Sequence, residues 1–130
     1  MKDFDAKKET NKVIEFIKKY YKEKHLGGAI LGISGGKDSA VVAALMTKAL
    51  GCENVIGVTL PCHSKKEDRN DAKLVSDFYG FELLNFNLTG VFEQFKEEVR
   101  HLGEFTEEEV KNSDINLKPR LRMATVYYLA

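Results

Sequence analysis

The strongest constraint on the fold is a short apolar run that passes through a glycine-rich turn into a long apolar segment. Residues Ala29 to Ile33 are apolar without alternation, which is typical of a parallel strand covered on both faces. The turn follows at once, and Ser39 to Leu50 is apolar almost all round, which favours a helix buried against a sheet. A strand that leads directly into a buried helix indicates an α/β fold.

The same alternation continues along the chain. Val55–Leu60 and Phe81–Asn85 predict two further strands, and Glu67–Phe78 predicts a helix between them. An amphipathic helix from about Lys7 to His25 precedes the first strand. We therefore expect a parallel sheet with right-handed crossovers and helices on both faces. In the helix before the third strand, one face is expected to carry the apolar residues Ala72, Val75, Phe78 and Tyr79.

The pattern changes after the third strand. Val91–Leu102 predicts an amphipathic helix, with Phe92, Phe95 and Val99 on its apolar side. The acidic stretch Glu104–Asp114 favours a solvated loop or a short helical turn. We expect a last helix over Leu117–Ala130, with Pro119 in its first turn, where proline is tolerated. This helix has no stop signal, so residues 1–130 are interpreted as the single N-terminal part of a domain whose next strand should follow.

Composition narrows the function classes. Lysine plus arginine equals aspartate plus glutamate, at 20 each, so no net field favours nucleic acid or a membrane surface. No apolar run approaches the length of a bilayer span, and the first ten residues lack a signal-peptide core. Cys52 and Cys62 are expected to be reduced thiols of a cytoplasmic protein. The three histidines have no partners at ligand spacing, which argues against zinc.

The glycine-rich turn has the chemistry of a phosphate site. Backbone N–H groups converge there, the helix dipole is positive, and glycines allow close approach of a phosphate. A carboxylate beside a polyphosphate is repulsive without a cation, so Asp38 implies bound Mg²⁺. The residues expected to bind ATP phosphates are Gly32, Ile33, Ser34, Gly35, Gly36, Lys37, Asp38 and Ser39.

Two common phosphate loops do not match this turn. The Walker pattern requires glycine where Leu31 stands and serine or threonine where Asp38 stands. The dinucleotide pattern requires another glycine soon after Gly36, and the next one is Gly51.

The whole string G-I-S-G-G-K-D-S resembles the loop of the ATP pyrophosphatases, which cleave ATP between its α and β phosphates. Three further stretches resemble NAD synthetases within that superfamily: S-A-V-V-A-A-L, V-I-G-V-T-L-P and D-A-K-L-V. The most specific resemblance is N-L-K-P-R-L-R-M, which begins at Asn116 and is similar to the family segment N-x-K-[AP]-R-x-R-M. The resemblance implies an adenine nucleotide alpha hydrolase-like, Rossmann-like fold.

The resemblance also implies residues for the acceptor, deamido-NAD: Asn116, Arg120, Arg122 and Tyr127. Arginine presents a planar fork suited to the pyrophosphate of that substrate. Arg120 and Arg122 are two apart and do not share a helix face, so at most one is expected to touch substrate. The family pattern favours Arg120. Tyr127 is as well suited to packing as to stacking on a ring.

The activity implied by the resemblance is ATP-dependent amidation of deamido-NAD by ammonia, through an adenylated intermediate, by a homodimeric ligase. ATP is then a co-substrate and Mg²⁺ the cofactor, and no side-chain nucleophile is expected. The 130 residues by themselves are expected to be inactive. Two alternatives stay open: a non-catalytic ATP-binding fragment, and another ATP pyrophosphatase of the GMP synthetase or tRNA-thiolation type.

Overall fold

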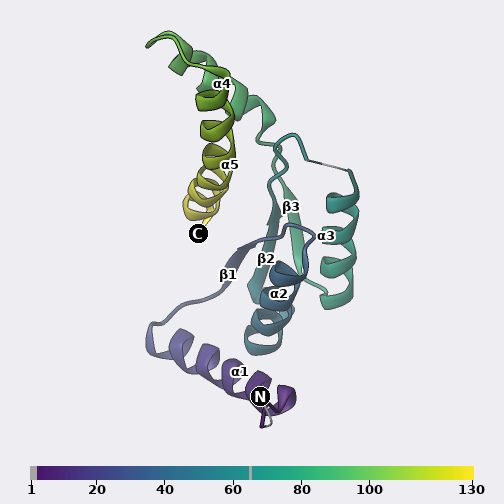
Figure 1. Cartoon of the computed structure of the whole chain (residues 1–130). Coiled ribbons are helices and arrows are strands. Elements are labelled where there is room, and N and C mark those ends of the chain that lie inside the picture. The colour runs from purple at the N-terminus through teal and green to yellow at the C-terminus, as the bar shows by residue number, and fades with distance from the viewer. Residues whose placement is uncertain (1–2, 65) are drawn as a thin grey trace.

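The computed structural model describes residues 3–64 and 66–130, and it contains a parallel sheet with helices on both faces (Figure 1). The chain alternates between strand and helix from β1 to β3 and ends in two helices. The elements are α1 (Ala6–Glu23), β1 (Ala29–Gly32), α2 (Lys37–Leu50), the 3-10 turn η1 (Cys52–Asn54), β2 (Val55–Thr59), α3 (Lys66–Tyr79), β3 (Glu82–Asn85), α4 (Thr89–Arg100) and α5 (Glu107–Leu129).

The sheet has the order β1-β2-β3, and both strand pairs are parallel. Ala29 lies opposite Val55 in the first pair, and Ile56 lies opposite Glu82 in the second. Strand β2 is therefore central, and its backbone is hydrogen-bonded on both edges. The predicted α/β architecture is confirmed, and η1 is an addition that the sequence pattern did not indicate.

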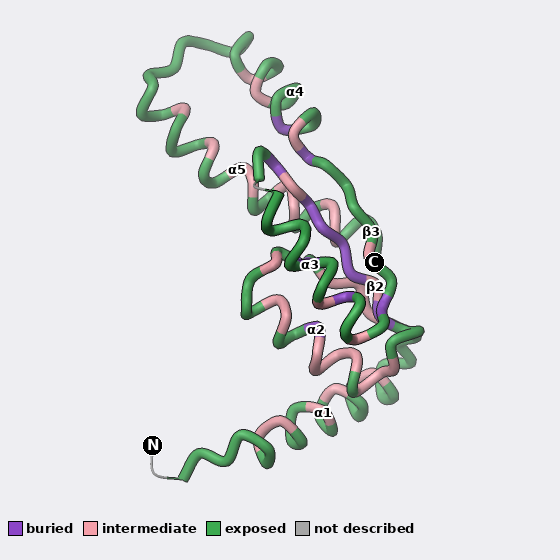
Figure 2. The backbone as a smooth tube through the Cα atoms, turned by 90° about the vertical axis from the view of Figure 1, so that its right-hand side faces the viewer, coloured by how far each residue is buried: buried purple, intermediate pink, exposed green. Residues whose placement is uncertain are grey.

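Two apolar clusters lie on opposite faces of the sheet. On one face α2 and α3 cover the cluster Ile33, Ala43, Val55, Ala72 and Phe81. On the other face α4 and α5 contribute to the cluster Val58, Leu60, Cys62, Leu88 and Phe92. Figure 2 shows the buried residues concentrated along β2 and its continuation. The core therefore surrounds the central strand, and alternate residues of β2 pack on the two opposite faces of the sheet.

Gly57 lies in the middle of β2 and has no room for a side chain. A Cβ at this position would lie 2.6 Å from Phe81 Cε2 and 2.9 Å from Ile33 Cγ1. Both neighbours belong to the first apolar cluster. The absence of a side chain at Gly57 therefore lets the ring of Phe81 pack directly on the strand.

The prediction for the end of the chain was wrong: one continuous helix replaces the expected loop and separate helix. Thr106 begins α5 with a capping box, in which the backbone N–H of Glu109 donates to Thr106 Oγ1 at 3.2 Å and the backbone N–H of Thr106 donates to Glu109 Oε2 at 2.8 Å. The bond from the Thr106 N–H lowers the pKa of Glu109. This cap starts the helix at Glu107, so Pro119 lies inside α5 and not in its first turn.

The helix faces also differ from the expectation in detail. In α2, Ala43 is buried, whereas Val41 is 58% and Val42 47% exposed. In α3, Phe78 is 81% exposed, although Ala72 is buried and Val75 and Tyr79 pack against the first cluster. A helix on one face of a three-stranded sheet buries one stripe, so apolar residues outside that stripe meet solvent.

Helix α1 precedes the sheet in the chain. The side chain of Asp5 caps α1 by accepting from the backbone N–H groups of Lys7 and Lys8, and α1 packs against α2.

The two cysteines differ in exposure. Cys52 is exposed and Cys62 is buried, and both thiols are free. Within residues 3–64 and 66–130, no helix combines the length and the apolar character that a membrane span requires.

Candidate functional site

The glycine-rich turn is braced by its own two serines. The backbone N–H of Ser34 donates to Ser39 Oγ at 3.1 Å, and the backbone N–H of Gly36 donates to Ser34 Oγ at 3.1 Å. The two hydroxyl oxygens lie 3.0 Å apart, and Ser39 Oγ also lies 3.1 Å from the carbonyl oxygen of Gly36. These bonds fix the turn between β1 and α2, and they engage both hydroxyl groups that the sequence assigned to phosphate.

Gly35 is in contact with the first turn of α3. Its φ is +84°, in the left-handed region that favours glycine, and a Cβ there would lie 2.5 Å from the carbonyl oxygen of Asp68. The same Cβ would lie 3.1 Å from Asp68 Cα, so the obstacle is backbone. The turn and α3 are therefore packed without an intervening side chain, which brings α3 to the edge of the glycine-rich turn.

The amino-terminal end of α2 is open for an anion. Gly36 is the N-cap residue, and within the described chain no side chain caps this helix. The first N–H groups of a helix have no partner inside the helix, and they carry the positive end of the helix dipole. Asp38 lies in this first turn and is exposed, as is Lys37. Such a helix terminus is suited to an anion.

A cavity of about 730 Å³ begins at this turn and runs beside the carboxyl end of β2. Its apolar wall includes Ile33, which follows β1, together with Val58 of β2 and Val126 of α5. Its polar groups include the hydroxyls of Ser34, Thr59 and Ser64. Ligands of open parallel sheets bind at the carboxyl ends of the strands, and this cavity has that position. An apolar wall with a polar margin suits a nucleotide.

The charged side chains that line the cavity are mainly cationic. They are Lys66, Arg69 and Arg122, with Asp68 as the one carboxylate among its described lining residues. Arg122 is fixed, because its Nε donates to the carbonyl oxygen of Leu60 at 3.0 Å. This bond joins α5 to the end of β2. A second hollow, of about 680 Å³ along α5, shares only Arg122 with the first among their described lining residues.

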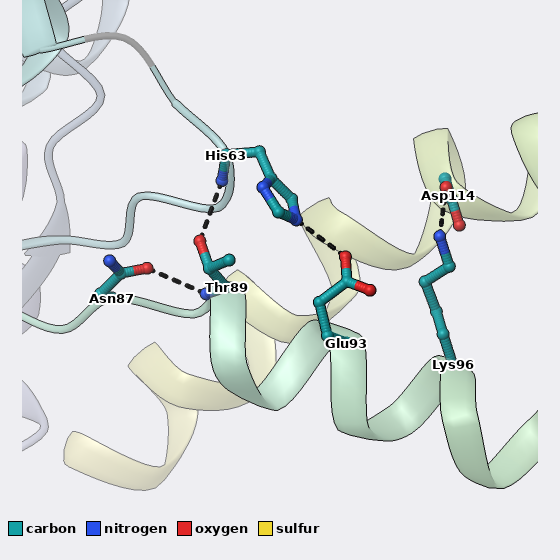
Figure 3. Close-up of polar contacts among 6 residues, drawn as sticks. All are labelled: His63, Asn87, Thr89, Glu93, Lys96 and Asp114. Atoms are coloured by element: carbon teal, nitrogen blue, oxygen red, sulfur yellow. Dashed lines mark hydrogen bonds and ion pairs between the residues drawn. The ribbon is translucent and has the colours of Figure 1, made fainter.

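The segment after β2 forms one margin of the cavity and is fastened to α4. Pro61 and Ser64 line the cavity, and His63 between them adopts a positive φ of 53°. The backbone N–H of His63 donates to Thr89 Oγ1 at 3.1 Å, and its Nε2 lies 2.8 Å from Glu93 Oε1 (Figure 3). The margin of the cavity is thus positioned by contacts outside the cavity.

Helix α4 is fastened to α5 in turn. Lys96 Nζ lies 2.8 Å from Asp114 Oδ2, and both side chains are largely buried (Figure 3). Lys96 and Lys118 also lie over the ring of Phe92, at 5.0 and 5.3 Å from its centroid. Since α5 carries Arg122 and the segment after β2 carries Pro61, α4 connects two walls of the cavity without lining it.

Cys62 lies close to this region without being activated. Its side chain belongs to the second apolar cluster. Burial raises the pKa of the Cys62 thiol, and the positive charges of Lys118 and Arg122 only partly oppose this effect. A raised pKa reduces the thiolate fraction at neutral pH, and the thiolate is the reactive form. The thiol is therefore suited to packing and not to sulfur chemistry.

The structure separates the residues that the sequence assigned to the site. Gly32, Ile33 and Ser34 line the cavity, as do Arg122 and Tyr127. Gly35, Gly36, Lys37, Asp38 and Ser39 form the adjoining turn and the start of α2 and are not among its lining residues. Asn116 and Arg120 lie together on an exposed face of α5, where Arg120 Nη1 donates to the carbonyl oxygen of Asn116 at 2.8 Å.

Sequence reasoning missed the cavity margin that follows β2. Lys66, Asp68 and Arg69 stand in the first turn of α3, which the sequence pattern treated only as the start of a helix. Their place in the sequence, shortly after a predicted strand, could have identified them. Residues just after the carboxyl end of a central parallel strand lie at the same edge of the sheet as the glycine-rich turn.

A sequence profile of the NAD synthase family matches residues 9–130. The chain belongs to the NAD synthase family. The NH3-dependent NAD+ synthetase of Methanococcus aeolicus is 38% identical over 124 residues, which cover 93% of this chain and 47% of that protein. The chain thus spans about half the length of the curated relatives it matches. This family assignment removes the GMP synthetase and tRNA-thiolation alternatives.

Solved structures of NAD synthase relatives have the same fold. The NH3-dependent NAD synthetase of Campylobacter jejuni, in complex with nitrate, has a TM-score of 0.84 and 31% identity, covering 97% of this chain and 52% of its own. The NMN synthetase of Francisella tularensis has a TM-score of 0.85 and 26% identity, covering 98% of this chain and 51% of its own. The expected fold class is therefore confirmed.

Replacement of Gly35 by alanine should disturb the loop, whereas replacement of Gly36 should be tolerated. Alanine at Gly35 requires a positive φ and collides with the backbone of Asp68, so we expect a loss of about 1–3 kcal/mol in the free energy of unfolding. Gly36 has a φ of −84°, and its Cβ would lie 3.3 Å from Ser34 Oγ. Urea unfolding of both variants tests this. Equal stability of Gly35→Ala and wild type would contradict it.

Proposed function

We propose that the whole protein forms NAD by ATP-dependent amidation of deamido-NAD with ammonia. The proposal rests above all on one observation: the uncapped start of α2 adjoins a cavity with an apolar wall and cationic margins in a member of the NAD synthase family. The names of its relatives support this activity, and the free thiols of Cys52 and Cys62 fit the cytoplasmic location that we also propose.

The proposed reaction has two steps. The nicotinate carboxylate of deamido-NAD attacks the α-phosphorus of ATP, a P–O bond forms, and the bond to the leaving pyrophosphate breaks. Ammonia then attacks the carbonyl carbon of the mixed anhydride, which gives NAD and AMP. No side-chain nucleophile is required, so the protein acts mainly by positioning and by stabilising charge. Backbone N–H groups of Gly35 and Gly36 are assigned to the pyrophosphate.

The proposed roles of Ser34, Ser39 and Asp38 follow from their positions. The two hydroxyls, which bond within the turn, are expected to reorient toward phosphate oxygens when ATP binds. Mg²⁺ is usually held by one or two carboxylates together with substrate phosphates, so the exposed carboxylate of Asp38 in the first turn of α2 fits that ion. The ion would offset the negative charge of the polyphosphate.

Arg122 is the residue best placed to contact both substrates. Its bond to Leu60 holds it at the end of β2, and it borders both the nucleotide cavity and the hollow along α5. A two-substrate reaction requires the acceptor carboxylate and the α-phosphate to meet, and a guanidinium between them would stabilise the charge that develops. Tyr127 lines the same cavity, so we propose that it contacts a substrate ring.

Asn116 and Arg120 bind the acceptor in this proposal only if substrate reaches the exposed face of α5. A second copy of the chain would provide such a position, and we propose that the protein is a homodimer. The support is a group of exposed apolar side chains on the last turns of α5: Met123 is 62%, Tyr127 82% and Tyr128 89% exposed. Large exposed apolar patches mark interaction surfaces.

ATP binding by the purified chain should depend on Mg²⁺ and on Asp38. We expect Asp38→Asn to weaken binding of Mg²⁺-ATP about tenfold and to remove most of the Mg²⁺ dependence, because the carboxylate is the proposed ligand. Asp77→Asn is the matched control, since Asp77 pairs with Lys73 on α3 away from the cavity. Calorimetric titration measures all three proteins. Absence of ATP binding to the wild type would overturn the proposed site.

The 130 residues alone should form no NAD from ATP, deamido-NAD and ammonia. The relatives are about twice as long, so much of the substrate pocket is expected to come from further residues. Chromatography of the products should follow both NAD and NMN, because one solved relative is an NMN synthetase. The full-length Campylobacter jejuni synthetase serves as the positive control. NAD formation by these residues would refute the expectation of inactivity, and NMN formation would change the proposed acceptor.

Dimerisation should depend on Tyr128. Analytical ultracentrifugation of the chain is expected to show a monomer–dimer equilibrium that Tyr128→Ser shifts toward monomer. The matched control is Phe78→Ser, because Phe78 is comparably exposed but lies on α3. A wild type that stays monomeric at all accessible concentrations would exclude this face as a self-sufficient interface.

A further inference from the structure

The first turn of α3 holds two cations in a place that does not favour helix stability. Lys66 is the first residue of α3, and Arg69 follows in the same turn. The amino-terminal end of a helix carries partial positive charge, so cations there are unfavourable and acidic residues are preferred. Glu67 and Asp68 match this preference, whereas Lys66 and Arg69 do not. Such local exceptions concentrate at functional sites.

Both cations line the nucleotide cavity, and no ion pair within residues 3–64 and 66–130 engages either of them. Arg122, the third cation of the cavity, already donates to the carbonyl oxygen of Leu60. The nearby carboxylate is Asp68, which also lines the cavity. The lining is therefore positive by formal charge, although the chain as a whole has a net charge of zero.

The contact between Gly35 and Asp68 sets the distance between this turn and the phosphate loop. A Cβ on Gly35 would lie within 2.5 Å of the carbonyl oxygen of Asp68, so the two backbones touch. Arg69 is the next residue in the chain, and it lines the same cavity as Ser34. An arginine side chain can span the short distance from that contact to a phosphate held by the loop, and it presents five N–H donors to phosphate oxygens.

We propose that Arg69, assisted by Lys66, binds the phosphates of the nucleotide and makes the cavity selective for polyphosphates. The proposal rests on the proposed function, since it assigns to the same cavity a second group of phosphate contacts on α3. The phosphate chain then lies between two helix starts, with backbone N–H groups of α2 on one side and the two side chains of α3 on the other. Nucleosides without phosphate gain nothing from this arrangement.

Titration of the purified chain with inorganic tripolyphosphate, ATP and adenosine, all with excess Mg²⁺, tests the proposal. We expect Arg69→Gln to weaken tripolyphosphate and ATP binding about tenfold, as loss of a charged hydrogen bond would. Lys66→Gln should have a smaller effect in the same direction. Adenosine binding should be unchanged in both variants. Arg100→Gln is the matched control, because Arg100 pairs with Glu97 on α4 outside the cavity.

The outcomes separate this proposal from the proposed function. If tripolyphosphate does not bind the wild type, or binds Arg69→Gln equally well, the role of Arg69 is overturned. An equal loss of adenosine binding in that variant also overturns it, because the effect would then be structural. If tripolyphosphate binding depends on Arg69 but ATP binds no more tightly than tripolyphosphate, the phosphate role stands and the nucleotide specificity of the proposed function fails.

Discussion

The rest of the structure depends on the pairing of β2 with a parallel strand on each edge. This pairing places the carboxyl ends of the strands at one edge of the sheet, where the glycine-rich turn begins and the cavity opens. It also divides the core, since Val55 packs under α2 and α3 while Val58 packs under α4 and α5. A one-residue shift of β2 would exchange these faces and displace Thr59 and Leu60 from the cavity.

The site is then assembled by contacts that cross between elements. Gly35 sets the loop against α3, Arg122 joins α5 to the end of β2, and His63 joins the cavity margin to α4. Each contact links segments far apart in the sequence, and each involves a backbone group or a specific polar side chain. The geometry of the cavity is thus a property of the packed domain and not of the glycine-rich motif alone.

The sequence predicted correctly those elements whose pattern lies within a few neighbouring residues. The run from Ala29 through the glycine-rich turn predicted both β1 and the helix that follows it, because apolar pattern and turn chemistry are read within a few residues. The assignment of this turn to phosphate stays a prediction. The start of α5 was also marked locally, by Thr106 and Glu109 as a capping box, but the acidic stretch was interpreted as a solvated loop or a short helical turn. The cavity margin at Arg69 depends on how α3 packs against the loop, which periodicity does not encode.

The uncapped start of α2 has a consequence for the thermodynamics of the free chain. Its first N–H groups have no partner inside the helix, so an anion bound there would add favourable free energy that the free chain lacks. A ligand that binds the native state alone adds RT ln(1 + [L]/Kd) to its stability. With the phosphate site that we propose, the melting temperature would depend on the anions in the sample, and preparations that differ in phosphate content would not be equivalent.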